Sequence, residues 1–90
     1  MSLAYVGYKN VTADAIVKTG PTKWYGFVCS ASSSLNIAVY DGTSTSGTLL
    51  YAKAVSAGDV VHFGGPGMAL NSGLFVDVVS GTGAVNVMYQ

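Results

Sequence analysis

Residues 35–51 read LNIAVYDGTSTSGTLLY. Leu35, Ile37 and Val39 occupy alternate positions at its start, which is the period-two pattern of a strand with one buried face. The run 41–48 consists only of Asp, Gly, Ser and Thr, and apolar residues resume after it. Asp followed by Gly favours a turn, because Asp bonds to nearby backbone and Gly accepts a positive φ. The stretch therefore predicts an antiparallel hairpin with a long exposed loop.

The same period-two pattern continues along the chain, in short segments of alternating apolar residues that are separated by Gly, Ser and Pro. No segment has the 3.6-residue period of an amphipathic helix. The candidate strand segments are 5–9, 13–18, 22–29, 35–40, 49–55, 60–63, 68–70, 73–79 and 84–89. We therefore predict an all-β fold of seven to eight short strands, forming a single antiparallel β-sandwich domain over residues 1–90. Its expected topology is jelly-roll-like, with an immunoglobulin-like order as the alternative.

Three local features refine this expectation. The polar run 30–34 predicts a turn after the strand 22–29, and Gly81-Thr82-Gly83 predicts a hairpin between the last two strands. Across that hairpin, three residues of one strand are expected to face inward opposite three of the other: Leu74, Val76 and Val78 opposite Val85, Val87 and Tyr89. Within 22–29, alternation places Tyr25, Phe27 and Cys29 on one face and Trp24, Gly26 and Val28 on the other. Either face could be the core.

The composition favours a subunit of an assembly. Four Lys and four Asp are the only formal charges, Arg and Glu are absent, and the net charge is zero. An ordinary domain is about a quarter charged, and net charge keeps folded proteins apart. We therefore expect a homo-oligomer, such as a trimer. Four scattered lysines offer no track for a phosphate backbone, and no apolar run reaches the roughly 18 residues of a membrane span. We expect no nucleic acid or membrane partner.

No residue pattern supports catalysis. His62 is the only histidine and lacks the base-and-orienter partners of a triad, while Cys29 lies in an apolar strand and is expected to be buried and inert. Gly64-Gly65-Pro66-Gly67 lacks the Lys-Ser or Lys-Thr of a phosphate loop, so a turn is the better interpretation. Asp41 has too few neighbouring carboxylates for a calcium site and is assigned to the turn. We expect no enzyme, cofactor or metal.

The aromatic residues are too numerous for all of them to face inward on alternating strands. Tyr25, Phe27, Tyr40 and Phe75 share strand faces with small or polar residues, so we predict them as interface residues between subunits. The alternative for each is that it fills the second face inside one chain. An exposed aromatic row can also stack on sugar rings.

Two segments carry a resemblance to a protein group. The first is Lys18-Thr19-Gly20-Pro21 leading into Trp24-Tyr25-Gly26-Phe27-Val28. The second is Ile37-Ala38-Val39-Tyr40-Asp41-Gly42-Thr43, with a small-residue tip, Leu49-Leu50-Tyr51 and the late Gly73-Leu74-Phe75-Val76. Together they resemble the small β-sandwich structural proteins of tailed phages and prophages. The resemblance implies a head decoration, head fibre or tail accessory subunit located in the virion, with other virion proteins as partners.

The residues and the resemblance lead to one functional expectation. We expect a non-enzymatic virion subunit that self-associates and packs into a larger particle, where low charge and surplus apolar strand faces suit repeated contacts. The alternative is a small carbohydrate-binding or receptor-recognition module. In that case some of the same aromatic residues would stack on a glycan.

Overall fold

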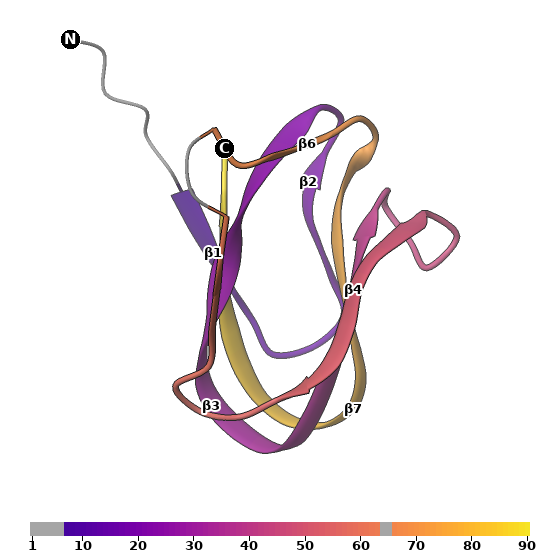
Figure 1. The fold of residues 1–90 in the computed structure, drawn as a ribbon. Coiled ribbons are helices and arrows are strands. Elements are labelled where there is room, and N and C mark those ends of the chain that lie inside the picture. Colours follow the sequence, from indigo (N-terminus) through magenta and orange to yellow (C-terminus); the bar gives the residue numbers. More distant parts are fainter. Residues whose placement is uncertain (1–6, 64–65) are drawn as a thin grey trace, which may run out of the picture.

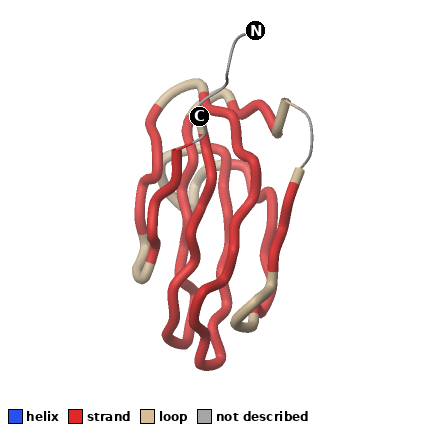
Figure 2. Tube along the Cα trace, turned by 90° about the vertical axis from the view of Figure 1, so that its left-hand side faces the viewer, coloured by secondary structure: helices blue, strands red, loops and turns tan. Residues whose placement is uncertain are grey.

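The computed structural model describes residues 7–63 and 66–90, and every regular element in these two ranges is a β-strand. Figures 1 and 2 show an elongated molecule whose strands run side by side along its length. Of the predicted segments, residues 5–6 and the Gly64-Gly65 part of the glycine-rich turn lie outside the described residues. The strands are β1 (Gly7–Val11), β2 (Ala15–Thr19), β3 (Thr22–Asp41), β4 (Thr48–Val55), β5 (Val60–His62), β6 (Met68–Leu70) and β7 (Gly73–Tyr89).

The fold is organised by its two long strands, β3 and β7. They pair antiparallel along nearly their whole length, from Trp24 opposite Tyr89 to Asp41 opposite Leu74. β1 and β2 pair with the far side of β7, whereas β4, β5 and β6 pair with the far side of β3. All the described strands therefore belong to one continuous antiparallel sheet.

β3 and β7 both bend near their middles, and the bend divides the sheet into two parts (Figure 1). We call the first half-sheet β1, β5 and β6 together with residues 22–29 of β3 and 84–89 of β7. The second half-sheet contains β2, β4, residues 35–41 of β3 and residues 73–79 of β7. The sheet folds over at the bend, so that the inner faces of the two half-sheets pack against each other.

The bend replaces two turns that the sequence predicted. Residues 30–34 and 81–83 do not connect hydrogen-bonded neighbouring strands; they lie within the continuous strands β3 and β7, at the bend, and pair with each other, with Ser33 opposite Thr82. The predicted hairpin between 73–79 and 84–89 is therefore wrong. Irregular register here and a positive φ at Gly81 let the paired strands curve together. A Cβ on Gly81 would collide with the backbone of Ser34.

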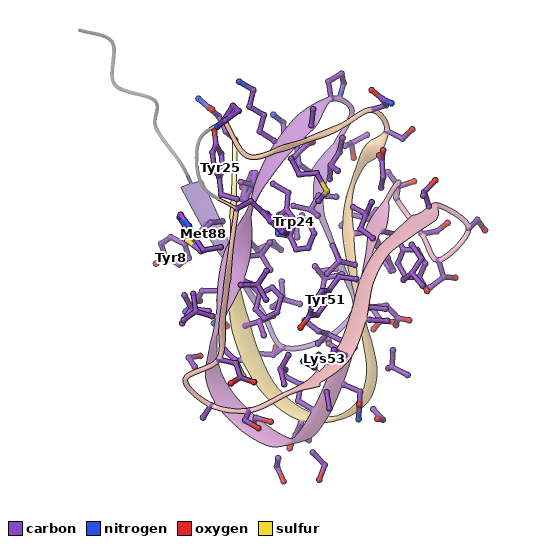
Figure 3. All side chains as sticks on the ribbon, viewed as in Figure 1. Tyr8, Trp24, Tyr25, Tyr51, Lys53 and Met88 are labelled. Atoms are coloured by element: carbon purple, nitrogen blue, oxygen red, sulfur yellow. The ribbon has the colours of Figure 1, made fainter. Side chains whose placement is uncertain are left out.

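The core lies between the two half-sheets and draws on both. Phe27 of the first half-sheet and Tyr51 of the second meet edge to face, with ring centroids 5.5 Å apart. Figure 3 shows Trp24 and Tyr51 pointing into this interior. The predicted inward residues Leu74, Val76, Val85 and Val87 are buried here, although they belong to one bent strand. The remaining buried members of the cluster are Val11, Val17, Trp24, Cys29, Leu35, Ile37, Val39, Val55 and Leu70.

A bulge in β3 explains why alternation could not identify the core face. The register against β7 shifts between Trp24 and Gly26, which adds one residue to β3. Trp24 and Phe27, predicted to lie on opposite faces, are both completely buried. Gly26 makes this possible because it adopts a φ of 123°, and a Cβ there would collide with the backbone of Val61.

The main fold prediction is confirmed, since the described chain is all-β and antiparallel. The hairpin predicted from residues 35–51 is also present: β3 and β4 pair across it, and residues 43–46 of its loop are exposed. The strands form one folded sheet, with two strands much longer than expected. The sandwich and jelly-roll details are not confirmed by this arrangement.

Candidate interaction surfaces

An apolar row crosses the outer face of the second half-sheet. Ile16 lies opposite Phe75, Phe75 lies opposite Tyr40, and Tyr40 lies opposite Leu49, so the row spans β2, β7, β3 and β4. We call these four residues the cross-strand row. Ile16 and Leu49 at its ends are 49% and 54% exposed, and the two central residues are half-buried. The row contains no charged residue.

The two central residues of the row were both predicted as interface residues. The rings of Tyr40 and Phe75 are tilted by 50°, with centroids 6.3 Å apart. They lie on the outer face because the adjacent Val39, Leu74 and Val76 face the core and are fully buried. The structure therefore brings two of the predicted residues together, from positions 35 residues apart, with part of each ring accessible.

The other two predicted interface residues lie in the first half-sheet and differ from each other. Phe27 has no exposed surface and packs on Tyr51 in the core, so the core alternative applies to it. Tyr25 occupies the bulge and is half-buried; its hydroxyl donates to Oε1 of Gln90 at 2.9 Å. Tyr25 is thus held beside the end of the chain, away from the cross-strand row.

The residues considered for catalysis are not brought together. His62 lies opposite Gly26 in β5, and its side chain is exposed. Cys29 is buried in the core, where its Sγ donates to the carbonyl oxygen of Ala31 at 3.3 Å. Within residues 7–63 and 66–90, no three His, Cys, Asp or Glu side chains gather as a metal site. Nor does this part of the chain contain a helix that could span a membrane.

Asp41 has a longer-range role than the local turn that the sequence predicted. Its carboxylate accepts hydrogen bonds from the backbone N–H groups of Ser72 at 2.9 Å and Asn71 at 3.1 Å. These bonds attach the turn before β7 to the end of β3. Because they stabilise the charged form, they hold the pKa of Asp41 below its ordinary value.

Asp14 and Asp77 form a carboxyl pair that the sequence did not reveal. Asp77 lies on the outer face of β7, opposite Ala38, and Oδ1 of Asp14 accepts from the backbone N–H of Val78 at 2.7 Å. Partial burial raises the pKa of Asp77, and the hydrogen bond and negative charge of Asp14 raise it further. The two residues are 63 positions apart, and only the β2–β7 pairing places them together.

The first half-sheet carries a second accessible surface, on its outer face. Tyr8 is 70% exposed and lies opposite Met88, and in the next row Asn10 lies opposite Asn86. Figure 3 shows Tyr8 and Met88 on the outside of the molecule. The sequence pattern does not reveal this surface, because it assigns Tyr8 only to a strand and because the neighbouring asparagines come from the two ends of the chain.

Comparison of this chain with protein-family models, with curated proteins and with solved structures found no match. The likeness to phage structural proteins therefore rests on the sequence segments alone. The cross-strand row and the Tyr8 surface are the features from which function can be argued.

Proposed function

We propose that this chain is a non-enzymatic structural subunit that associates with copies of itself, as a component of a tailed-phage or prophage virion. The observation that carries the proposal is the cross-strand row. It places four large apolar side chains in a line across four strands, with the outermost two about half exposed. Aromatic and aliphatic side chains of this kind form the centres of protein interfaces.

The partner that packs against this row is a second copy of the chain. None of the four residues of the row is charged, so two copies can pack their rows together without burying a charged side chain of the row itself. The zero net charge also removes the general repulsion between copies. The proposed interface consists of Tyr40 and Phe75, with Ile16 and Leu49 at its ends. Phe27 does not belong to it, because its side chain is fully buried in the core.

The first experiment measures absolute mass by light scattering on a sizing column, over at least a tenfold range of concentration. We expect a closed oligomer whose dissociation constant rises by about tenfold or more in Tyr40→Ala, because truncating a central aromatic commonly costs more than 1 kcal/mol of binding. The matched control is Tyr8→Ala, which removes an exposed tyrosine from the other half-sheet and should leave the mass unchanged.

A strict monomer at every concentration contradicts self-association. Equal masses for wild type and Tyr40→Ala, together with a lower melting temperature of the variant, would assign Tyr40 to the stability of the single chain. The virion part of the proposal is tested separately by the genome neighbourhood. Adjacent genes for capsid or tail components support it, and an unrelated metabolic operon contradicts it.

A further inference from the structure

The outer face of the first half-sheet contains an open groove with a volume of about 760 Å³. Small-molecule sites commonly measure roughly 300–1,000 Å³. The groove lies over β1, the last residues of β7 and the first part of β3. The residues that line it are Gly7, Tyr8, Asn10, Val28, Asn86 and Met88.

The pairing of three strands brings the lining residues together. Tyr8 lies opposite Met88 in one row across β1 and β7. In the next row on this face, Asn10 lies opposite Asn86, and Asn86 lies opposite Val28 of β3, whose side chain is half-buried. Residues from both ends of the chain and from β3 therefore meet at one groove.

The two asparagines supply an oriented pair of polar groups. Nδ2 of Asn10 donates to Oδ1 of Asn86 at 2.9 Å, and both side chains lie on the accessible face. The bond uses the nitrogen of one amide and the oxygen of the other. Oδ1 of Asn10 is left as an acceptor and Nδ2 of Asn86 as a donor, next to an exposed tyrosine ring.

We propose that this groove binds a neutral sugar, with a pyranose ring stacked on Tyr8 and its hydroxyls bonded to Asn10 and Asn86. A pyranose offers an apolar face to an aromatic ring and adjacent hydroxyls that both donate and accept. None of the six lining residues carries a charge, so the groove has no group to balance a phosphate or carboxylate ligand. The apolar surface of Met88 and Val28 suits the C–H groups of the same ring.

This inference is independent of the proposed assembly function, because the groove and the cross-strand row lie on different half-sheets. A subunit joined to copies of itself through the row would still expose the groove. Self-association and sugar binding can therefore fail separately. Tyr40→Ala tests self-association and serves as the control for sugar binding. Tyr8→Ala tests sugar binding and serves as the control for self-association.

The probe is an array of immobilised neutral and acidic glycans, followed by titration of the best-bound neutral glycan in solution. We expect Tyr8→Ala to weaken binding by about tenfold or more, the effect of losing roughly 1.4 kcal/mol. Tyr8→Phe keeps the ring and should retain most of the affinity. Asn86→Ala should weaken binding by removing the free donor, and Tyr40→Ala should not affect it.

Thermal melting of each variant shows whether it is folded, and the 70% exposure of Tyr8 predicts little change for Tyr8→Ala. The proposal is overturned if the protein binds no glycan on the array, or if it binds only acidic glycans. Glycan binding that survives Tyr8→Ala in a folded protein also overturns it. If Tyr8→Ala instead lowers the oligomeric mass while no glycan binds, this face is a protein interface and the sugar site is wrong.

Discussion

Two aspartates of this chain are held in surroundings that move their pKa in opposite directions. Asp41 accepts two backbone hydrogen bonds, which favour its charged form and lower its pKa. Asp77 is partly buried beside Asp14, and both burial and the neighbouring carboxylate raise its pKa. Because the pKa in the unfolded chain is close to 3.8 for both, the two residues make stability depend on pH with opposite signs.

We predict that Asp77→Asn stabilises the protein at neutral pH. The raised pKa means that the folded state binds the Asp77 proton more tightly than the unfolded chain. The wild type is therefore favoured below the unfolded pKa and loses that advantage as pH rises through the folded pKa. Asn cannot ionise and still offers a donor to Asp14. Urea unfolding should show a gain of less than about 1 kcal/mol at pH 7, since solvent screens this partly exposed pair.

The gain from Asp77→Asn should disappear below the ordinary aspartate pKa, where the wild-type residue is protonated too. Asp41→Asn is the matched control with the opposite sign. It should lose about 1 kcal/mol at pH 7, because it weakens charge-assisted bonds to the turn before β7, and the loss should shrink as pH falls through the lowered folded pKa. A destabilised Asp77→Asn at neutral pH would contradict the assigned role of Asp14.

Residue faces could be predicted only where the strands are regular. Tyr40 and Phe75 lie in a regular stretch of the β3–β7 pairing, and alternation correctly separated them from the fully buried Val39, Leu74 and Val76. Phe27 follows a bulge, so the alternation that placed it on the face opposite Trp24 did not hold, and the core alternative applies to it. A bulge depends on how a partner strand 60 residues away is paired, and a period-two pattern contains no information about that partner.

At the scale of elements, the sequence predicted where strands occur better than how they connect. The segments 22–29 and 35–40 are strands, and so are 73–79 and 84–89, but each pair is one continuous bent strand. Runs of Ser and Gly favour both a chain reversal and a sharp bend within a strand. In this chain the two runs lie opposite each other in the register of β3 and β7, so both strands bend at the same level and remain paired.

Three of the outer strands, β1, β2 and β4, share a feature that discourages edge pairing. Within the described part of the chain, β1 and β2 pair only with β7, and β4 pairs only with β3. Each of them places a lysine opposite a buried core residue: Lys9 opposite Val87, Lys18 opposite Leu74 and Lys53 opposite Ile37. Figure 3 shows Lys53 on the inner side of β4, below Tyr51. Inward-pointing charges on edge strands prevent sheets from joining edge to edge.

We predict that Lys53→Val promotes association through the edge of β4. The variant would present an eight-residue strand without a charge, and a strand of another chain could pair with it without burying an ammonium group. The expected result is concentration-dependent formation of high-mass, thioflavin-T-positive material at protein concentrations where the wild type stays clear. Light scattering and dye fluorescence over time measure it.

Lys23→Val is the control for this effect, since it removes the same charge from an exposed position of β3. Lys23 lies opposite Ala69 of β6, and its backbone also bonds with Gln90, so it is not at a sheet edge. Equal aggregation of the two variants would mean that lower charge, and not the exposed edge, is responsible. A Lys53→Val protein that remains as soluble as the wild type would show that the edge is protected in another way.

For the whole molecule, the distribution of charge favours contacts through faces over contacts through edges. The edge strands carry three of the four lysines, whereas the cross-strand row contains none. The charged groups near the row are Asp77, which lies on the same outer face, and its neighbour Asp14. Face-to-face association therefore gains from apolar burial and meets at most a weak like-charge repulsion.

This arrangement predicts how salt acts on self-association. Attraction between opposite charges weakens as salt shortens the Debye length from about 10 Å at 0.1 M to about 3 Å at 1 M. The free energy gained by burying apolar surface does not depend on the Debye length. Screening by salt would also weaken the repulsion between the Asp14–Asp77 pairs of two copies. The oligomer mass measured by light scattering should therefore stay constant or rise between low and high sodium chloride. Dissociation on adding salt would show that lysine–aspartate attraction holds the copies together, and it would move the interface from the cross-strand row to the lysine-bearing edges.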